Sequence, residues 1–234
     1  MIARTLTAAA ALMLPIAAAA QTPNANWTGG YGGFVGTLGI MSADPADHWC
    51  YVACDSASMA TWGGAAGVTL GYNMQQGNFV FGVEGDINAG KFDNYEFHEG
   101  SSYRSSMGAK WGAHGTLRGR AGLAVDNTMF FVTGGIAAVR ASYRQDYVSA
   151  EFADNRGFMP LTKTQVGLAA GAGVEHAISP RMSVKLEYLY IGLPSVNGGN
   201  YYLDIDDPAS IREDSRITYR SDAHLFRFGV NYRF

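Results

Sequence analysis

Residues 111–125, WGAHGTLRGRAGLAV, alternate between two kinds of side chain. After Trp111, the odd-numbered positions carry only apolar or small residues, namely Ala113, Gly115, Leu117, Gly119, Ala121, Leu123 and Val125. The even-numbered positions hold every polar residue of the stretch, namely His114, Thr116, Arg118 and Arg120. Successive side chains of a β-strand point to opposite faces, so a period of two indicates a strand. This stretch therefore predicts a strand with one apolar face and one face that mixes small and charged residues.

The same alternation recurs along the chain. We expect eight such strands, at residues 27–41, 60–74, 78–92, 111–125, 128–143, 164–178, 182–193 and 222–234. Three connections, at 75–77, 126–127 and 179–181, are short and contain the residue types of hairpin turns. Four others, at 42–59, 93–110, 144–163 and 194–221, are long and polar. The pattern predicts an all-β chain of antiparallel hairpins.

The first 20 residues have a different composition. Arg4 precedes an uninterrupted apolar run at residues 8–20, which ends in Ala18-Ala19-Ala20. A membrane-spanning helix needs about 20 apolar residues, so this run is too short for one. A positive start followed by a short apolar run and small residues is typical of a secretory signal peptide. We expect residues 1–20 to be removed and residues 21–234 to form one domain.

The apolar face of the strands must point either inward or outward. A soluble ligand-binding barrel would bury its bulky residues and cover its exterior with charge, but here the opposite face is mostly Gly, Ala and Thr with few charges. A bulky apolar exterior is favourable only in lipid, and small residues leave space in a narrow interior. The sequence therefore predicts an eight-stranded antiparallel up-and-down transmembrane β-barrel. Aromatic residues near strand ends, among them Trp27, Trp62, Trp111 and Tyr143, are expected to form interfacial girdles.

The inward face of this predicted barrel carries nine charged residues. Glu84 and Arg118 are symmetric about one connection, and Glu175 and Lys185 about another, so each pair should lie on neighbouring strands. Near-balance of charge favours an ion-paired plug, because a selective filter would favour one sign. The alternative is a small gated pore with Arg118, Arg120 and Glu84 at its constriction. The full set is Glu84, Asp86, Arg118, Arg120, Glu175, Lys185, Glu187, Arg227 and Arg233.

Several motifs resemble the small eight-stranded outer-membrane proteins of the porin-like surface-antigen family, and a similar barrel anchors peptidoglycan-tethering proteins. They are Trp27-Thr28-Gly29-Gly30-Tyr31, residues 115–122, residues 130–135, residues 171–176, residues 186–190 and Tyr232-Arg233-Phe234. The resemblance implies residence in the outer membrane of a Gram-negative bacterium. It also implies that the barrel-assembly machinery recognises the terminal alternation Phe228, Val230, Tyr232 and Phe234.

The remaining candidates lie mainly in the polar connections. Cys50 and Cys54 are expected to form a disulfide, because exported proteins mature in an oxidising compartment; a metal site with His48 is the weaker alternative. An acidic run at 204–214 lacks the spacing of a calcium loop. His114, His176 and His224 have no nearby nucleophile motif, and His48 and His98 are two isolated loop histidines that give little support for haem.

We therefore expect a non-enzymatic outer-membrane protein without cofactor or metal. Its roles would be envelope integrity and surface antigenicity, with weak porin activity. A diffusion pore, a receptor or adhesin, and a lipid-modifying enzyme are the competing hypotheses. The expected partners are outer-membrane lipids, the barrel-assembly machinery and host or environmental ligands of the loops. The net charge of −3 gives no reason to expect nucleic acid.

Overall fold

The computed structural model describes residues 25–47, 59–99, 103–149, 156–158, 161–203 and 211–234. The predicted signal peptide lies outside these residues and stays a prediction. No helix in the described part of the chain is long and apolar enough to cross a bilayer. The strands of this part are β1 (Gly29–Asp47), β2 (Met59–Gln76), β3 (Phe79–Glu99), β4 (Tyr103–Val125), β5 (Thr128–Ser149), β6 (Arg156–Phe158), β7 (Leu161–Ala177), β8 (Met182–Gly192), β9 (Val196–Leu203) and β10 (Ile211–Arg233).

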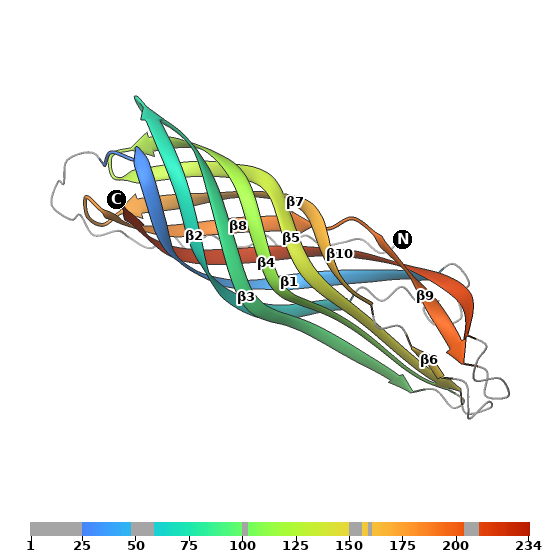
Figure 1. The fold of residues 1–234 in the computed structure, drawn as a ribbon. Helices are drawn as coiled ribbons and strands as arrows, with labels where there is room; N and C mark the ends of the chain where they lie inside the picture. Colours follow the sequence, from blue (N-terminus) through green and yellow to red (C-terminus); the bar gives the residue numbers. More distant parts are fainter. Residues whose placement is uncertain (1–24, 48–58, 100–102, 150–155, 159–160, 204–210) are drawn as a thin grey trace, which may run out of the picture.

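Eight of these strands close into one antiparallel barrel (Figure 1). Each pairs with the next along the chain, and β1 pairs with β10 from Tyr31 opposite Arg233 to Asp47 opposite Ile217. The ring order is β1, β2, β3, β4, β5, β7, β8 and β10. The fold class predicted from the alternation is confirmed.

The two short strands continue the wall at the end opposite the tight turns. The pairing of β7 with β8 ends at Leu168 opposite Gly192. Farther out, β6 pairs with β5, β9 pairs with β10, and β6 and β9 pair with each other. The tube therefore extends beyond the ends of β8 between β5 and β10 (Figure 1).

Several strands are longer than the alternation predicts. Residues 93–99 and 103–110, expected in a loop, extend β3 and β4, and residues 144–149 extend β5. The long connection at 194–221 contains β9 and the first half of β10. These segments lack one consistently apolar face because their outward face lies beyond the lipid, so period two loses its hydrophobic signal there.

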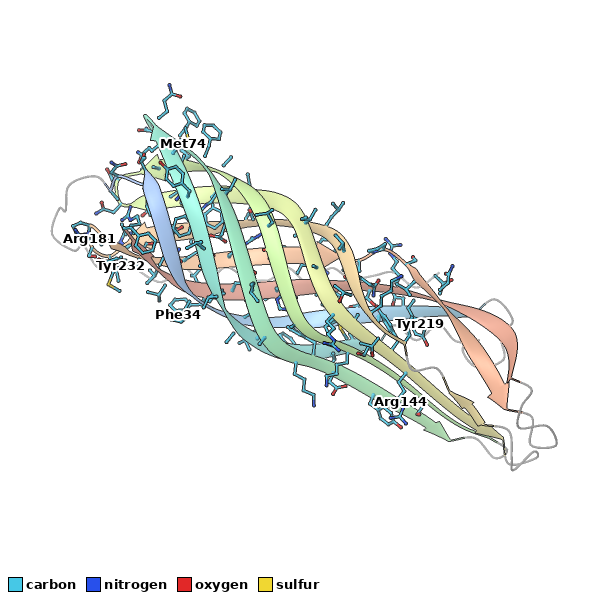
Figure 2. The ribbon with its side chains drawn as sticks, viewed as in Figure 1. Phe34, Met74, Arg144, Arg181, Tyr219 and Tyr232 are labelled. Carbon is cyan, nitrogen blue, oxygen red and sulfur yellow. The ribbon has the colours of Figure 1, made fainter. Side chains whose placement is uncertain are left out.

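Lipid-facing and inward-facing residues alternate as predicted. On the outer surface, Phe34, Leu38, Ile87 and Phe228 are exposed, and Figure 2 shows Phe34 and Met74 projecting from it. On β8 the inward residues are buried, while Met182, Leu186 and Tyr188 on the opposite face are exposed. An exterior of this kind is stable only in lipid.

A β-bulge in β4 reverses this alternation once. The register with β5 passes from Trp111 opposite Ala141 to His114 opposite Val139, so β4 has one extra residue there. A bulge of this kind changes which residues face inward. Trp111 is consequently buried in the interior. Trp27 and Tyr143, which lie outside β4, are buried there as well. The prediction that these three belong to an aromatic girdle was wrong, whereas Trp62 and Phe234 do face outward.

The tight turns lie at the end of the barrel opposite β6 and β9. β2 and β3 are joined through Gly77 and Asn78, whereas the turn was predicted at residues 75–77. Gly77 has φ +60°. β4 and β5 are joined through Asp126 and Asn127, with Asp126 at φ 52°. Left-handed conformations of this kind suit Gly, and tolerate Asp, at the first position of a two-residue turn.

Replacing Gly77 by Val should destabilise the barrel by about 1–2 kcal/mol, because a β-branched residue is strained at positive φ. Urea unfolding in lipid vesicles measures the change. Gly85→Ala is the matched control, since its added Cβ would have its nearest neighbours at 3.7 Å and 3.9 Å. Equal stability of the Gly77→Val variant and the wild type would show that the turn does not constrain the hairpin.

Candidate functional site

The structure places all nine predicted charged residues in the interior of the barrel, and all of them are buried. Their positions follow from the alternation on five strands. β3 carries Glu84 and Asp86, β4 carries Arg118 and Arg120, β7 carries Glu175, β8 carries Lys185 and Glu187, and β10 carries Arg227 and Arg233.

Arg118 is the centre of this group. Its guanidinium binds Glu84 Oε1 at 2.7 Å and Asp86 Oδ2 at 3.0 Å, and it also contacts Glu187. Its Nε donates to Thr116 Oγ1 at 2.9 Å, and Thr116 Oγ1 in turn donates to Asp86 Oδ2 at 2.6 Å. One cation therefore joins carboxylates from β3 and β8, which are not neighbours in the barrel.

Glu84 is the corresponding centre among the carboxylates. It binds Lys185 Nζ at 2.7 Å and Arg118 at 2.7 Å, with Arg120 at 3.5 Å. The Tyr31 hydroxyl donates to Glu84 Oε2 at 2.8 Å and accepts from Arg120 Nη1 at 2.9 Å. Tyr31 therefore links two charges of the network.

Glu175 and Lys185 have the predicted register, but each of them forms its ion pair with another residue. Glu175 and Lys185 are opposite each other on β7 and β8. The Lys185 ammonium nevertheless binds Glu84 across the interior, while Glu175 binds Arg120 at 2.8 Å. Ser183 and Asn231 donate to Glu175 at 2.6 Å and 3.0 Å. Glu175 thus has its own partners and does not require Lys185.

Arg227 and Arg233 differ in their surroundings, although both belong to β10. Arg227 binds Asp86 at 3.1 Å and Glu187 at 3.0 Å, which completes the network. Arg233 lies over the Trp27 ring at 4.8 Å and donates to the Asn26 carbonyl oxygen at 2.7 Å. The charge network, defined as Arg118, Arg120, Lys185 and Arg227 with Glu84, Asp86, Glu175 and Glu187, has four cations and four carboxylates and is neutral.

Tyr31 was missed as a member of this site. Its side chain occupies the space beside Gly71, its register partner on β2, where an added Cβ would overlap the Tyr31 ring. The sequence contained a signal for this role, because Tyr31 is separated from Val35 and Thr37 by even numbers of residues along the strand and therefore faces inward with them. A bulky aromatic opposite a glycine on the polar face indicates an interior contact.

Two apolar clusters lie next to the network. The turn-end cluster consists of Trp27, Val80, Ala124, Met129, Phe131 and Ala177. Arg120 of the network lies over the Phe131 ring at 4.2 Å.

The outer cluster is larger and includes Met41, Phe92, Trp111, Leu189, Tyr143 and Tyr219. The rings of Tyr143 and Tyr219 stack with centroids 4.8 Å apart, and Tyr143 is hydrogen-bonded to Gln165 and Ser221. Inward-facing side chains of both clusters and of the network are 8% exposed or less.

The remaining candidates are histidines that lie on different strands and residues that lie outside the described part of the chain. Cys50, Cys54, His48 and the aspartates at 204–207 lie outside the described residues, and their predicted roles stay predictions. Among the described residues, no group of three or more His, Cys, Asp or Glu is arranged to hold a metal ion. His176 bonds with Thr128 at 2.9 Å and His224 with Tyr188 at 2.6 Å.

The terminal strand presents its apolar residues to the outside. Phe228, Tyr232 and Phe234 are exposed, and Val230 is partly exposed on the same face. Phe234 continues the backbone pairing by donating to the Gly30 carbonyl oxygen at 3.0 Å. Recognition of these residues by the assembly machinery stays a prediction.

A closed eight-stranded barrel with an apolar exterior and an ion-paired interior defines an integral membrane protein of the outer-membrane class. The sequence matches the model of the outer membrane protein beta-barrel domain over residues 6–234, and the chain belongs to that family. It is located in the outer membrane.

Similar proteins include the 25 kDa and 31 kDa outer-membrane immunogenic proteins of Brucella melitensis. The first is 28% identical over 91% of this chain and 81% of its own length, and the second is 29% identical over 92% and 87%. A 22 kDa outer membrane protein of Rhizobium leguminosarum bv. viciae is 30% identical over 72% of this chain and 65% of that protein. Among solved structures, OprG of Pseudomonas aeruginosa has the same type of fold, with TM-score 0.53 and 14% identity over 90% of this chain and 98% of that chain.

Replacing Arg118 by Met should destabilise the barrel by about 3–5 kcal/mol, because it leaves buried carboxylates without their central cation. Urea unfolding in vesicles measures this change. Lys91→Met is the control, because the Lys91–Asp93 pair is exposed and such pairs contribute about 0–1 kcal/mol. Equal losses in the two variants would contradict a central role for Arg118.

Proposed function

We propose that the protein is a closed, structural barrel of the outer membrane that presents surface antigens and does not act as an open pore or an enzyme. The observation that carries this proposal is the filled interior. The neutral charge network and the two apolar clusters occupy the lumen along the axis, and their inward side chains are nearly inaccessible.

Several features support a structural role. Removing the partner of a buried charge destabilises a fold strongly. The network therefore favours the one arrangement of its five strands in which these charges and Tyr31 meet. Ions would have to cross the stacked rings of Tyr143 and Tyr219 as well as this network. Strong strand pairing around the closed ring makes such a barrel a stable component of the envelope.

The antigen role is supported by the relatives and by topology. The Brucella proteins are named immunogenic outer-membrane proteins. The chain segments opposite the tight turns join strands that project beyond the apolar belt, as the outer loops of such barrels do. The positions of His114, His176 and His224, separated over β4, β7 and β10, favour structural over catalytic roles.

Refolded residues 21–234 should remain electrically silent in a planar bilayer. A heat-modifiable band on a gel provides the control that the barrel is folded and inserted. Arg118→Ala should also remain silent, because both apolar clusters remain in place, although the variant should unfold more readily. Uniform, steady conductance steps from the wild type would contradict the proposal and would support a small diffusion pore.

A further inference from the structure

A groove crosses the lipid-facing surface of the barrel over β1, β2 and β3. Its volume is about 1010 Å³, and most of the residues that line it are apolar. Its floor contains Gly32 on β1 and Gly85 on β3, two outward positions without a side chain. Phe34 and Tyr72 line it with large, exposed side chains. The groove is therefore a gap in an apolar belt that carries bulky residues elsewhere.

The strand register explains why the groove exists. Gly32 pairs with Leu70 on β2, and Leu70 pairs with Gly85 on β3. Gly85 in turn pairs with Leu117 on β4. Glycine therefore occupies every second position of this cross-strand row on the outer face. The neighbouring rows carry larger outward residues beside it, namely Phe34, Val68 and Ile87 on one side and Tyr72 and Val83 on the other.

The row also runs obliquely through the membrane. In the other direction Gly32 pairs with Tyr232 on β10, and Tyr232 pairs with Met182 on β8. Met182 is the first residue of β8, Gly32 the fourth of β1 and Gly85 the seventh of β3, so the row moves away from the tight turns as it crosses the strands. Adjacent strands are about 4.8 Å apart and tilted by about 40°, so the four steps from Met182 to Gly85 rise by roughly 12 Å. The groove thus leads from the membrane interface at the turn end toward the middle of the bilayer.

Arg181 lies at the interface end of this groove. It directly precedes Met182, and its side chain is exposed. Its Nη1 donates to the Tyr232 hydroxyl at 3.2 Å, and this is its one side-chain bond with a described residue. The other N–H groups of the guanidinium and the proton of the Tyr232 hydroxyl are therefore available to a ligand. Figure 2 shows Arg181 and Tyr232 together at this end of the barrel, with Phe34 farther along it.

The chemistry of the two parts matches one kind of molecule. A guanidinium beside a hydroxyl suits a phosphate, because both donate hydrogen bonds to its oxygens. An acyl chain in the groove contacts protein on both of its sides, whereas a chain on the convex wall contacts protein on one side, so dispersion favours the groove. A phosphate at the interface followed by a chain toward the bilayer centre is the order of groups in a glycerophospholipid. The short turns mark the periplasmic end of the barrel, so the leaflet concerned is the inner one.

We propose that this groove binds one glycerophospholipid of the inner leaflet. Its phosphate accepts hydrogen bonds from Arg181 and Tyr232, and one of its acyl chains lies over Gly32 and Gly85. The bound chain fills the gap that the two glycines leave in the apolar belt. The site lies outside the lumen and does not depend on whether the barrel conducts.

Native mass spectrometry of the refolded protein in uncharged detergent measures binding of palmitoyl-oleoyl phosphatidylglycerol. Arg181→Gln should bind this lipid roughly fivefold more weakly, the factor that one cation near an anionic lipid contributes. Gly32→Leu should bind it on the order of tenfold more weakly, because the new side chain displaces about two methylene groups of the acyl chain. The barrel accommodates this change, since a Cβ added at Gly32 has no atom closer than 3.5 Å.

Each variant has a matched control. Gly36→Leu places the same side chain on the same face of β1 but outside the groove, and a Cβ added there has its nearest atom at 4.0 Å. Arg220→Gln removes an exposed cation of β10 that lies toward the opposite end of the barrel. Neither control should change lipid binding. A heat-modifiable band confirms that each variant is folded.

The proposal requires contacts to both the phosphate and the chain. Unchanged binding to either Arg181→Gln or Gly32→Leu would therefore overturn it, and so would an equal loss in the matched control. Diacylglycerol, which has the chains without the phosphate, should bind the wild type and Arg181→Gln equally. Inorganic phosphate that displaces the lipid at equal concentration would show a site for free anions instead. A dimer of the wild type that disappears in Gly32→Leu would show that a second copy of the chain occupies the groove.

Discussion

The structure depends on the pairing of β1 with β10. In hydrocarbon, each backbone N–H or C=O group without a partner costs several kcal/mol, so a sheet with open edges is not viable there. The 17 register pairs from Tyr31–Arg233 to Asp47–Ile217 remove both edges at once. Once the ring is closed with eight strands, the diameter is small, and the interior has only enough space for side chains.

The narrow interior explains the composition of the strands. Glycines such as Gly71 leave space for a long inward neighbour, here Tyr31. The charged residues then have to be neutralised inside the barrel, since lipid surrounds it on all sides. Four cations and four carboxylates achieve this, and the remaining cation, Arg233, is held by the Trp27 ring and a carbonyl oxygen at the turn end. The network is therefore a consequence of closure as well as a contributor to it.

The sequence alone was sufficient to place the nine inward charges, because period two requires only the parity of each residue. The opposition of Glu84 and Arg118 also follows from counting outward from a connection. The pairing of Lys185 with Glu84 was not predictable in this way, because it joins β3 and β8 across the lumen. Trp111 was misassigned because a single extra residue in β4 reverses parity, and nothing in WGAHG marks the bulge unambiguously. Strand ends were missed wherever the outward face lies beyond the lipid, since the hydrophobic contrast between the two faces disappears there.

These longer strands change how the outer end of the molecule is understood. Four long flexible loops would present their residues in many arrangements, whereas β3, β4, β5 and β10 here continue as paired strands beyond the apolar belt. The short strands β6 and β9 bridge β5 and β10 where β8 has ended. Residues on such a tube keep fixed spacings, as Lys110 and Ser142 do on their shared face. The sheet therefore sets the geometry of the residues at the outer end of the molecule, and closure of the barrel determines the geometry of the sheet.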